Sequence, residues 1–271
     1  MADSTDTRLR SEARFQDERM LRANQGEEEF RDRFYFINAA ALADYEELLS
    51  GLAGRHVVVV GSSDGGVIPL ARDGVRVEGI DISPVSIEKL RSAIEKYGLA
   101  EYASARVMDA EALEYPDGSI DAISCSGVLH HLDTERALRS WARGLKDDGF
   151  VVLFEPLAFH PVAALFRLLT PSMRTPDEHP LRSRDFALMR KYFGSADIRY
   201  YGLTTVCCAA IGIIPGTARL SRKLLPVFEA IDRALLKTLP FLRHVCWLTV
   251  ARLAAPVRPG QAPAGAGRTM A

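Results

Sequence analysis

The chain has 271 residues, of which 48% are hydrophobic and 25% are charged, a balance typical of a folded globular protein rather than a fibrous or disordered one. Its 34 Lys and Arg residues nearly cancel its 35 Asp and Glu residues, so no overall positive field favours nucleic acid as a partner. No stretch reaches the roughly 18 consecutive apolar residues that cross a bilayer, and the charged first residues lack the apolar centre of a secretory signal.

The cysteines indicate neither a disulfide framework nor a zinc site. Cys125, Cys207, Cys208 and Cys246 form no CxxC pair and lack the spacing of zinc ligands. With no secretory signal expected, they predict a reducing, cytoplasmic location. The sequence leaves the oligomeric state open.

Two segments are expected before the core. Residues 1–26 are polar and without a periodic pattern, so we expect a flexible arm. Residues 27–55 are expected to form an N-terminal helical cap, because their apolar residues recur at spacings of three and four, as on one helix face. These residues are Phe30, Phe34, Ile37, Ala41, Tyr45 and Leu48.

Residues 56–203 show the alternation of strand and helix that builds a parallel sheet. The run HVVVV at 56–60 is closed by Gly61 and is typical of a strand buried on both faces. Strands joined by helical crossovers predict a doubly wound α/β fold with a mostly parallel, seven-stranded sheet. Further strands are predicted at 75–80, 105–108, 120–124, 150–154 and 198–203, and helices at 67–72, 84–97, 134–145, 162–169 and 183–193, the last capped by Ser183.

The remainder of the chain departs from this alternation. Residues 204–243 are unusually apolar and are interrupted by proline, which predicts a helical insertion that caps the acceptor side of the core. Residues 244–254 return to strand character and are expected to form the last core strand. Residues 255–271 are rich in Pro, Gly and Ala, so we expect a disordered tail.

A glycine-containing turn follows the first strand. Residues 61–66, GSSDGG, would bring backbone amides and a helix N-terminus close to a ligand. Asp81 ends the second strand, where a carboxylate accepts hydrogen bonds from both ribose hydroxyls. These features predict an adenosine-containing ligand. Gly61, Ser63 and Gly66 also form a degraded GxGxxG dinucleotide fingerprint, so a nicotinamide cofactor is an alternative at this point.

Residues 56–155 resemble the class I S-adenosylmethionine-dependent methyltransferases in five segments that follow in the family's order. These are the turn, Asp81, the segment VMDAEALEYPDGSIDAI with Asp109, the segment SGVLHHLD, and the segment LKDDGFVVLFEP. The resemblance implies S-adenosylmethionine as cofactor and S-adenosylhomocysteine as product, with Asp81 at the ribose and Asp109 at the adenine amino group. The implied cofactor-binding residues are Gly61, Ser62, Ser63, Gly65, Asp81, Ile82, Asp109, Ala110 and Ser126.

Two positions depart from the family's pattern. Val59 stands where the family usually has an acidic residue near the methionine end of the cofactor, and Ser63 replaces the middle glycine of the turn. The missing carboxylate removes a charge-assisted contact worth about 1.5 to 3 kcal/mol, for which Asp64 or Glu111 could compensate. These departures leave two alternatives: a relative that catalyses another reaction, such as a cyclisation, or a ligand-binding module without cofactor affinity.

The candidate catalytic residues follow the fourth and fifth strands. Methyl transfer from a sulfonium needs an aligned acceptor and the exclusion of water, and a hydroxyl or ammonium acceptor must also lose a proton. His130 and His131 lie at the carboxyl edge, where open sheets bind ligands, so either is a candidate base. Glu155 is a candidate either to orient that histidine or to accept the proton itself. For all three, a packing or capping role is the alternative.

The segments that would cover this edge supply the candidate acceptor-binding residues. Asp177, Glu178 and His179 also suggest a metal site, but adjacent residues rarely all point at one ion, so we expect no metal. The candidates for acceptor binding are Phe34, Tyr35, His160, Asp177 and His179.

The composition of the covering segments predicts the class of acceptor. They are apolar or aromatic, and they would make a dry pocket for a small lipid-like, prenyl or polyketide molecule, unless they only pack on one another. The predicted function is therefore S-adenosylmethionine-dependent methyl transfer to an oxygen, nitrogen or carbon nucleophile of such a molecule. The cations of the insertion are also compatible with helices that lie on a membrane surface: Arg219, Arg222, Lys223, Arg233, Lys237 and Arg243.

Overall fold

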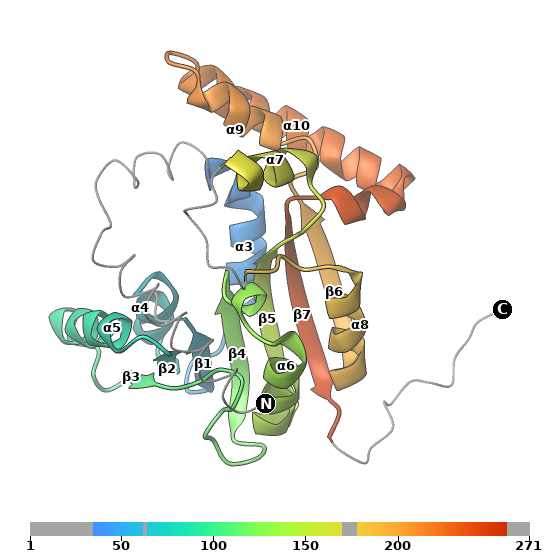
Figure 1. Cartoon of the computed structure of the whole chain (residues 1–271). Coiled ribbons are helices and arrows are strands. Elements are labelled where there is room, and N and C mark those ends of the chain that lie inside the picture. Colours follow the sequence, from blue (N-terminus) through green and yellow to red (C-terminus); the bar gives the residue numbers. More distant parts are fainter. Residues whose placement is uncertain (1–34, 62–63, 170–177, 259–271) are drawn as a thin grey trace.

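The computed structural model of the chain describes residues 35–61, 64–169 and 178–258. In this part of the chain a seven-stranded sheet has the strand order β3-β2-β1-β4-β5-β7-β6 (Figure 1). The strands are β1 (His56–Val60), β2 (Arg76–Asp81), β3 (Ala103–Val107), β4 (Ile120–Ser126), β5 (Leu145–Pro156), β6 (Phe193–Tyr201) and β7 (Leu248–Pro256).

The pairing of the strands confirms the expected doubly wound, mostly parallel sheet. β1 pairs in parallel with β2 and β4, β2 with β3, and β4 with β5. β7 lies between β5 and β6 and is antiparallel to both. The chain order reverses between β1 and β4, and at such a switch point the carboxyl ends of two strands leave room for a ligand.

Helices cover both faces of the sheet. Val57 and Val59 of β1 pack with residues of α3, α4 and α5, whereas Val58 and Val60 pack with residues of α6 and α8. Successive side chains of a strand point to opposite faces, so the unbroken HVVVV run fits a strand covered on both sides. The helices on the two faces are α3 (Ala39–Leu48), α4 (Asp64–Arg72), α5 (Pro84–Lys96), α6 (Thr134–Gly144) and α8 (Ser183–Tyr192).

Local sequence fixes where these helices begin. Ser83 caps α5 because its Oγ accepts a hydrogen bond from the Ser86 amide at 3.0 Å, and proline follows at the first helical position. At α8 the expectation was wrong: Ser183 is the first helical residue, and Arg182 holds the cap position. The Asp185 carboxylate accepts a hydrogen bond from the Arg182 amide at 2.8 Å, so the acidic residue of the first turn stabilises this helix start.

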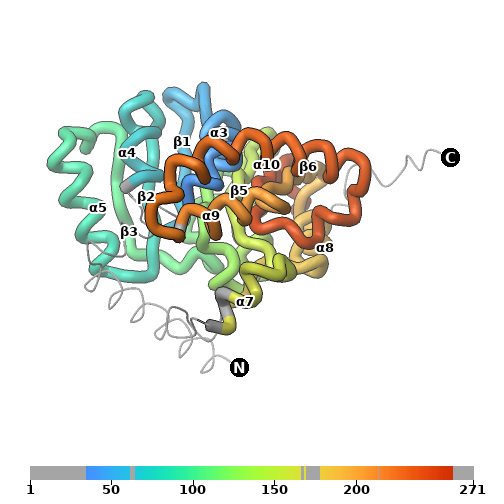
Figure 2. Tube along the Cα trace, turned by 90° about the horizontal axis from the view of Figure 1, so that it is seen from above, coloured from blue at the N-terminus to red at the C-terminus, as the bar shows by residue number. Residues whose placement is uncertain are grey.

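The insertion covers the carboxyl edge of the sheet with helices. Figure 2 shows α9 and α10 crossing above the strands when the molecule is seen from that end. No helix in the described part of the chain is long and apolar enough to span a membrane. The covering elements are α7 (Pro161–Leu169), α9 (Val206–Ile213), α10 (Ala218–Thr238) and the 3-10 helices η1 (Phe36–Asn38), η2 (Leu129–His131) and η4 (Pro240–Val245).

The structure corrects two expected boundaries. The last strand was expected from residue 244, but residues 240–245 form η4 and β7 begins at Leu248, because Pro240 starts a short helix rather than a strand. The tail was expected to be disordered from residue 255, yet β7 continues to Pro256, and the Val257 amide donates to the Tyr192 carbonyl. The expected arm at 1–26 and the tail beyond 258 lie outside the described residues.

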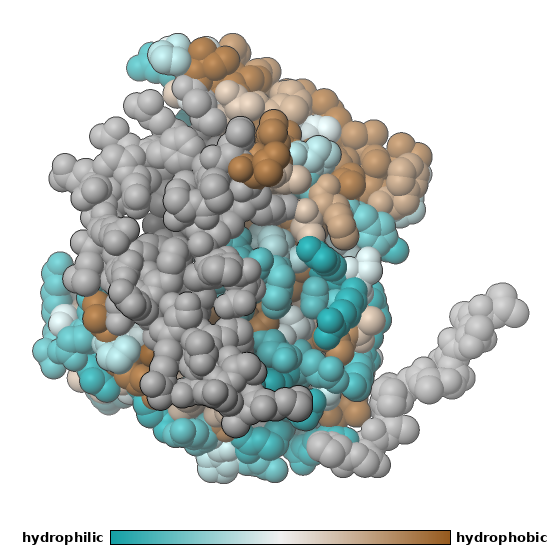
Figure 3. Space-filling view, in the orientation of Figure 1, coloured by the Kyte–Doolittle hydropathy of each residue, from teal (hydrophilic) through white to brown (hydrophobic). Residues whose placement is uncertain are grey.

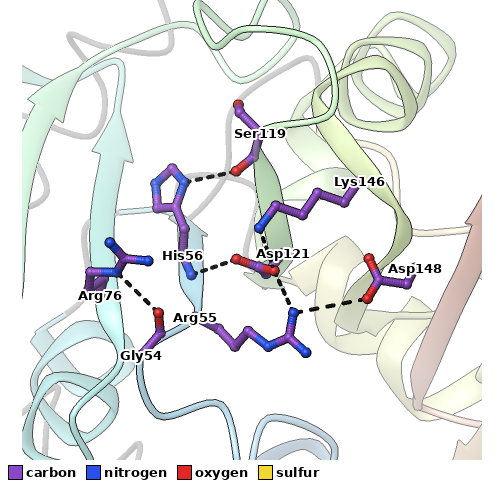
Figure 4. A network of polar contacts seen from close by, with 8 residues as sticks. All are labelled: Gly54, Arg55, His56, Arg76, Ser119, Asp121, Lys146 and Asp148. Atoms are coloured by element: carbon purple, nitrogen blue, oxygen red, sulfur yellow. Dashed lines mark hydrogen bonds and ion pairs between the residues drawn. The ribbon is translucent and has the colours of Figure 1, made fainter.

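At the amino edge of the sheet, Asp121 is the centre of a polar network (Figure 4). Its side chain is 6% exposed and accepts hydrogen bonds from Arg55 at 2.9 Å, from the His56 amide at 2.9 Å and from Lys146 at 2.8 Å. Burial raises the pKa of this carboxyl, but the bonds from Lys146, His56 and Arg55 outweigh burial and lower the pKa to about 2. The network ties the starts of β1, β4 and β5 together.

Candidate active site

The turn after β1 requires glycine at its first position. Gly61 has a φ of 88°, and a Cβ built on it would lie 2.7 Å from Cγ2 of Val128. Its amide donates to the Ile80 carbonyl at 2.9 Å, which holds the turn close to the end of β2. A Cβ on Gly65, in the first turn of α4, would meet nothing within 4 Å. Gly61 is therefore required by close packing, and space remains beside Gly65 at the start of α4; Ser62 and Ser63 lie outside the described residues.

The carboxylates that follow β2 and β3 are held in the same way. Oδ1 of Asp81 accepts a hydrogen bond from the Ser83 amide at 2.8 Å, and Oδ1 of Asp109 accepts one from the Glu111 amide at 2.8 Å. Each bond spans two residues and fixes the carboxylate against its own loop. Two oriented carboxylates on neighbouring strand ends suit the ribose and the adenine amino group of an adenosine ligand.

The other candidate cofactor residues lie beside these carboxylates. Ile82 is half-buried, and Ala110 is buried with its carbonyl accepting from Nε1 of Trp141 at 2.8 Å. Ser126 is exposed at the end of β4. All three lie at the carboxyl edge of the sheet, so the described members of the predicted cofactor set lie on one side of the molecule.

His130 and Glu155 form a buried pair where β4 and β5 end. Oε2 of Glu155 lies 2.7 Å from Nδ1 of His130, and the exposed fractions of the two residues are 0% and 8%. A carboxylate only accepts, so Nδ1 carries the hydrogen, and the tautomer that this bond selects has its lone pair on Nε2. Oε1 of Glu155 accepts from the amides of Val128 at 3.0 Å and Leu129 at 2.7 Å. Glu155 is thereby engaged on both oxygens, which suits it to orient His130 rather than to take a proton itself.

His131 and Glu178 lie against the His130 ring. The ring centroids of the two histidines are 4.2 Å apart. One nitrogen of each histidine and one carboxylate oxygen of Glu178 lie within 4.8 Å of one another. Two imidazoles and a carboxylate are ligands that can bind a divalent cation. The approach of Glu178 is fixed by its neighbour, because the His179 amide donates to the His130 carbonyl at 2.8 Å.

Sequence reasoning did not foresee this approach of Glu178 to the histidines. The loop that contains Glu178 and His179 was singled out for its ionisable residues, but the only joint role considered for Glu178 was a metal site with its chain neighbours, and that site was not expected. Only a tertiary contact, 47 or more residues away in the chain, brings it to His130 and His131. Asp177 lies outside the described residues.

The other candidate acceptor residues are not brought to this cluster. His160 is 4% exposed; its Nε2 lies 3.2 Å from the Leu203 carbonyl, and its Nδ1 accepts from the Ala163 amide at 3.4 Å. Because both ring nitrogens are used within the protein, His160 fixes the start of α7. Tyr35 is exposed beside η1, and Phe34 lies outside the described residues.

The structure explains how the chain accommodates Val59. Val59 is buried in the apolar layer that contains Tyr45. Ser124, its partner on β4, shares a hydrogen bond of 2.5 Å with the Tyr45 hydroxyl. Burial raises the pKa of Tyr45 well above its ordinary value, so this hydroxyl is neutral. An apolar and neutral layer therefore fills the place of the family's acidic side chain.

Glu111, one of the two residues that could compensate for Val59, is held against α6. Its carboxylate is buried and turned toward the start of α6, where Oε1 accepts from the Asp133 amide at 2.8 Å and Oε2 lies 3.3 Å from Arg136. Glu111 therefore ties the loop after β3 to α6. The side chain of Asp64 lies outside the described part.

Comparison with known proteins gives the family. A model of the methyltransferase domain matches residues 58–153. Phosphatidylethanolamine N-methyltransferase of Cereibacter sphaeroides is 31% identical over 140 residues, which cover 51% of this chain and 67% of that protein. Ubiquinone biosynthesis O-methyltransferase of Alkalilimnicola ehrlichii is 32% identical over 137 residues, which cover 49% of this chain and 54% of that protein. The chain thus spans only about half the length of the second relative.

A solved structure shares the fold. Geranyl diphosphate C-methyltransferase of Streptomyces coelicolor A3(2), determined with Mg²⁺, geranyl diphosphate and S-adenosylhomocysteine, superposes with a TM-score of 0.57 over 79% of each chain at 14% identity. These matches decide between the two cofactors that the glycine turn had left open. The chain belongs to the class I S-adenosylmethionine-dependent methyltransferases, an enzyme family whose cofactor is S-adenosylmethionine.

Proposed function

We propose that the protein transfers a methyl group from S-adenosylmethionine to an oxygen, nitrogen or carbon nucleophile of a small, largely apolar, lipid-like acceptor. The order of the candidate residues along the carboxyl edge carries this proposal. Asp109 follows β3, Asp81 ends β2, Gly61 follows β1 and His130 follows β4, and these four strands are neighbours in that order. Neighbouring strands lie about 4.8 Å apart, so the edge offers an adenosine site at one end and a proton acceptor at the other.

Each residue has one task in this mechanism. The cofactor supplies an electrophilic methyl group on a sulfonium. Asp81 and Asp109 bind the ribose and the adenine, and the turn between β1 and α4 receives the methionine portion. The covering helices exclude water and hold the acceptor in line with the methyl carbon. His130, oriented by Glu155, takes the proton of a hydroxyl or ammonium acceptor at Nε2.

The lipid-like nature of the acceptor is supported by the covering elements and by the relatives. α9 and α10 bury an apolar layer above the sheet that includes Val206, Ala209 and Phe228. The two curated relatives are named for a phospholipid and for ubiquinone biosynthesis. All of these point to an apolar molecule that carries one reactive polar group.

Calorimetry with S-adenosylhomocysteine tests the cofactor site. Asp81→Ala removes charge-assisted hydrogen bonds to the ribose, worth roughly 3 kcal/mol together, so we expect about a hundredfold loss of affinity. Asp185→Ala is the matched control, because Asp185 also accepts a local amide hydrogen bond but lies at the start of α8. Equal affinity in wild type and Asp81→Ala would refute the proposed cofactor site.

Mass spectrometry of lipid extracts incubated with the enzyme and labelled cofactor tests the reaction. We expect a product that carries the labelled methyl group. A changed product without the label would support a cyclisation or another rearrangement instead, the alternative raised by Val59 and Ser63. Loss of activity in EDTA, restored by a divalent cation, would assign His130, His131 and Glu178 to a cation rather than to proton removal.

A further inference from the structure

Large apolar side chains that face solvent are concentrated at the covered end of the molecule. Among the described residues, ten of the fifteen exposed large apolar or aromatic side chains lie in the segments 159–168 and 214–241. Figure 3 shows hydrophobic surface over α7, α9 and α10, whereas the lower part of the same view is mainly hydrophilic outside the grey atoms. Exposed apolar residues that gather in this way mark a binding surface. We call this set the apolar surface: Phe159, Val162, Leu165, Leu168, Ile214, Leu220, Val227, Ile231, Leu239 and Phe241.

α10 has a second apolar face, which is exposed to solvent. Leu220, Val227 and Ile231 are separated by seven and four residues, so they lie on one side of the helix. Their exposed fractions are 53%, 54% and 41%. The adjoining side of α10, with Leu224, Leu225 and Phe228, packs in the apolar cluster with residues of η1 and α9. Burial against the protein therefore explains one face of α10 but not the other.

The inner face of α10 is fixed to the sheet by a buried acid. Asp232 is 5% exposed, and its carboxylate accepts from the amides of Leu203 at 3.0 Å and Thr204 at 2.7 Å. The hydroxyl of Thr205 adds a contact at 3.3 Å. These bonds follow directly after β6 and fix the rotation of the helix about its axis. They hold the stripe of Leu220, Val227 and Ile231 toward solvent.

The charge of the same segment is almost entirely positive. Between residues 206 and 245 the sequence contains six Lys and Arg residues but only Glu229 and Asp232 as acids. Since Asp232 is buried and hydrogen-bonded, Glu229 is the only acid left near the surface of this segment. The long stems of Lys and Arg can lie along apolar surface while their charges reach outward to anionic groups.

We propose that α7 and α10 seat the protein on the surface of an anionic lipid bilayer. The apolar surface would enter the boundary between headgroups and acyl chains, and the cations of the insertion would contact lipid phosphates. The partner is a lipid surface because it offers apolar depth and negative charge together. No described helix spans a membrane, so this is attachment from one side. The inference goes beyond the proposed reaction and does not require it, but it would bring a lipid-like acceptor to the end of the sheet where the candidate site lies.

Co-sedimentation of the full chain with vesicles tests the proposal. We expect binding to vesicles of phosphatidylcholine that contain phosphatidylglycerol, little binding to phosphatidylcholine alone, and weaker binding at high salt. The triple variant L220S/V227S/I231S should bind anionic vesicles at least tenfold more weakly. Replacing Arg219, Lys223 and Lys237 by glutamine should weaken binding by roughly fivefold for each cation removed.

Matched controls separate the possible outcomes. L42S/Y97S removes exposed apolar side chains elsewhere, so it should bind vesicles like the wild type. Absence of binding to anionic vesicles, or wild-type binding by the serine variant, would overturn the proposal. If the wild type instead forms a dimer that the serine variant loses in light scattering, and binds no vesicles, the surface joins two copies of the chain and the proposal is equally wrong. Affinity for S-adenosylhomocysteine, measured on every variant, reports on folding and tests the proposed function separately.

Discussion

The two edges of the sheet hold carboxylates in different ways. At the amino edge, Asp121 lies between Arg55 and Lys146, and their cations neutralise its charge within the fold. At the carboxyl edge, Asp81 and Asp109 are oriented by amides of their own loops, and Glu155 orients a histidine. An acidic side chain thus supports stability where cations surround it, and it is positioned for binding or for orienting a base where local amides hold it.

Removing the histidine at the carboxyl edge should give the largest effect. His130→Gln keeps a donor toward Glu155 but lacks the basic nitrogen, so we expect kcat for a hydroxyl or ammonium acceptor to fall by about 10²- to 10⁴-fold. His131→Gln is the matched variant, and a smaller loss there would assign the base to His130. Affinity for S-adenosylhomocysteine should stay unchanged in both. If His130→Gln keeps more than a third of the wild-type kcat, the assigned role is wrong.

Adding a methyl group to the turn tests how tightly the carboxyl edge is built. Gly61→Ala places its Cβ against Val128 at a positive φ, so we expect a loss of about 2 to 4 kcal/mol in the free energy of unfolding, together with weaker cofactor binding. Gly51→Ala has the same sign of φ, 70°, but meets nothing within 4 Å. It should lose only about 1 kcal/mol. Chemical denaturation of both variants isolates the steric part, and equal losses would contradict it.

Breaking the network at the amino edge should cost stability without touching the candidate site. The pKa of Asp121 falls from 3.8 to about 2 on folding, which corresponds to about 2 kcal/mol. Because the folded-state pKa is the lower one, this stabilisation is complete above 3.8 and disappears as the pH falls toward 2. Asp121→Asn should therefore unfold about 2 kcal/mol more easily at neutral pH, and the difference should shrink in acid. A constant difference across pH would argue against this origin.

The smallest effect is expected in the layer between the two edges. Tyr45→Phe removes the hydroxyl that bonds Ser124 and leaves that serine buried without this partner, which should cost about 1 kcal/mol in thermal unfolding. Tyr102→Phe, at an exposed tyrosine, should change stability by less than about 0.5 kcal/mol. If the two variants are equally stable, the hydrogen bond between Tyr45 and Ser124 does not stabilise this layer.

Most of the fold could be predicted from local sequence patterns. β1 was predictable because a β-branched run closed by glycine leaves few alternatives, and α5 was predictable because Pro84 and Gly98 mark its two ends. The start of β7 was not, since an apolar segment after Pro240 suits a short helix and a strand equally well until tertiary pairing with β5 and β6 decides. Local periodicity in the sequence does not show which strands pair in the folded protein.

Part of the candidate site could also be predicted from local sequence and topology, whereas the rest depended on tertiary contacts. Gly61 and Asp81 follow strand ends, so their edge was predictable from topology alone, although the roles proposed for them await the binding experiment. The pairing of His130 with Glu155 was one of two options that the sequence left open. The places of Glu178, Glu111 and His160 depended on contacts 22 or more residues apart in the chain, as with Glu111 and Asp133. The spacing of neighbouring residues along the chain does not indicate that a side chain makes such a contact.

The bonds of Asp232 also constrain how a substrate can enter. α10 cannot lift away from β6 as a hinged flap without giving up the amide bonds to Leu203 and Thr204, and a buried carboxylate stripped of its donors is costly. The end of the covering layer near β6 is therefore rigid. A substrate must therefore reach the carboxyl edge without displacing this end of α10.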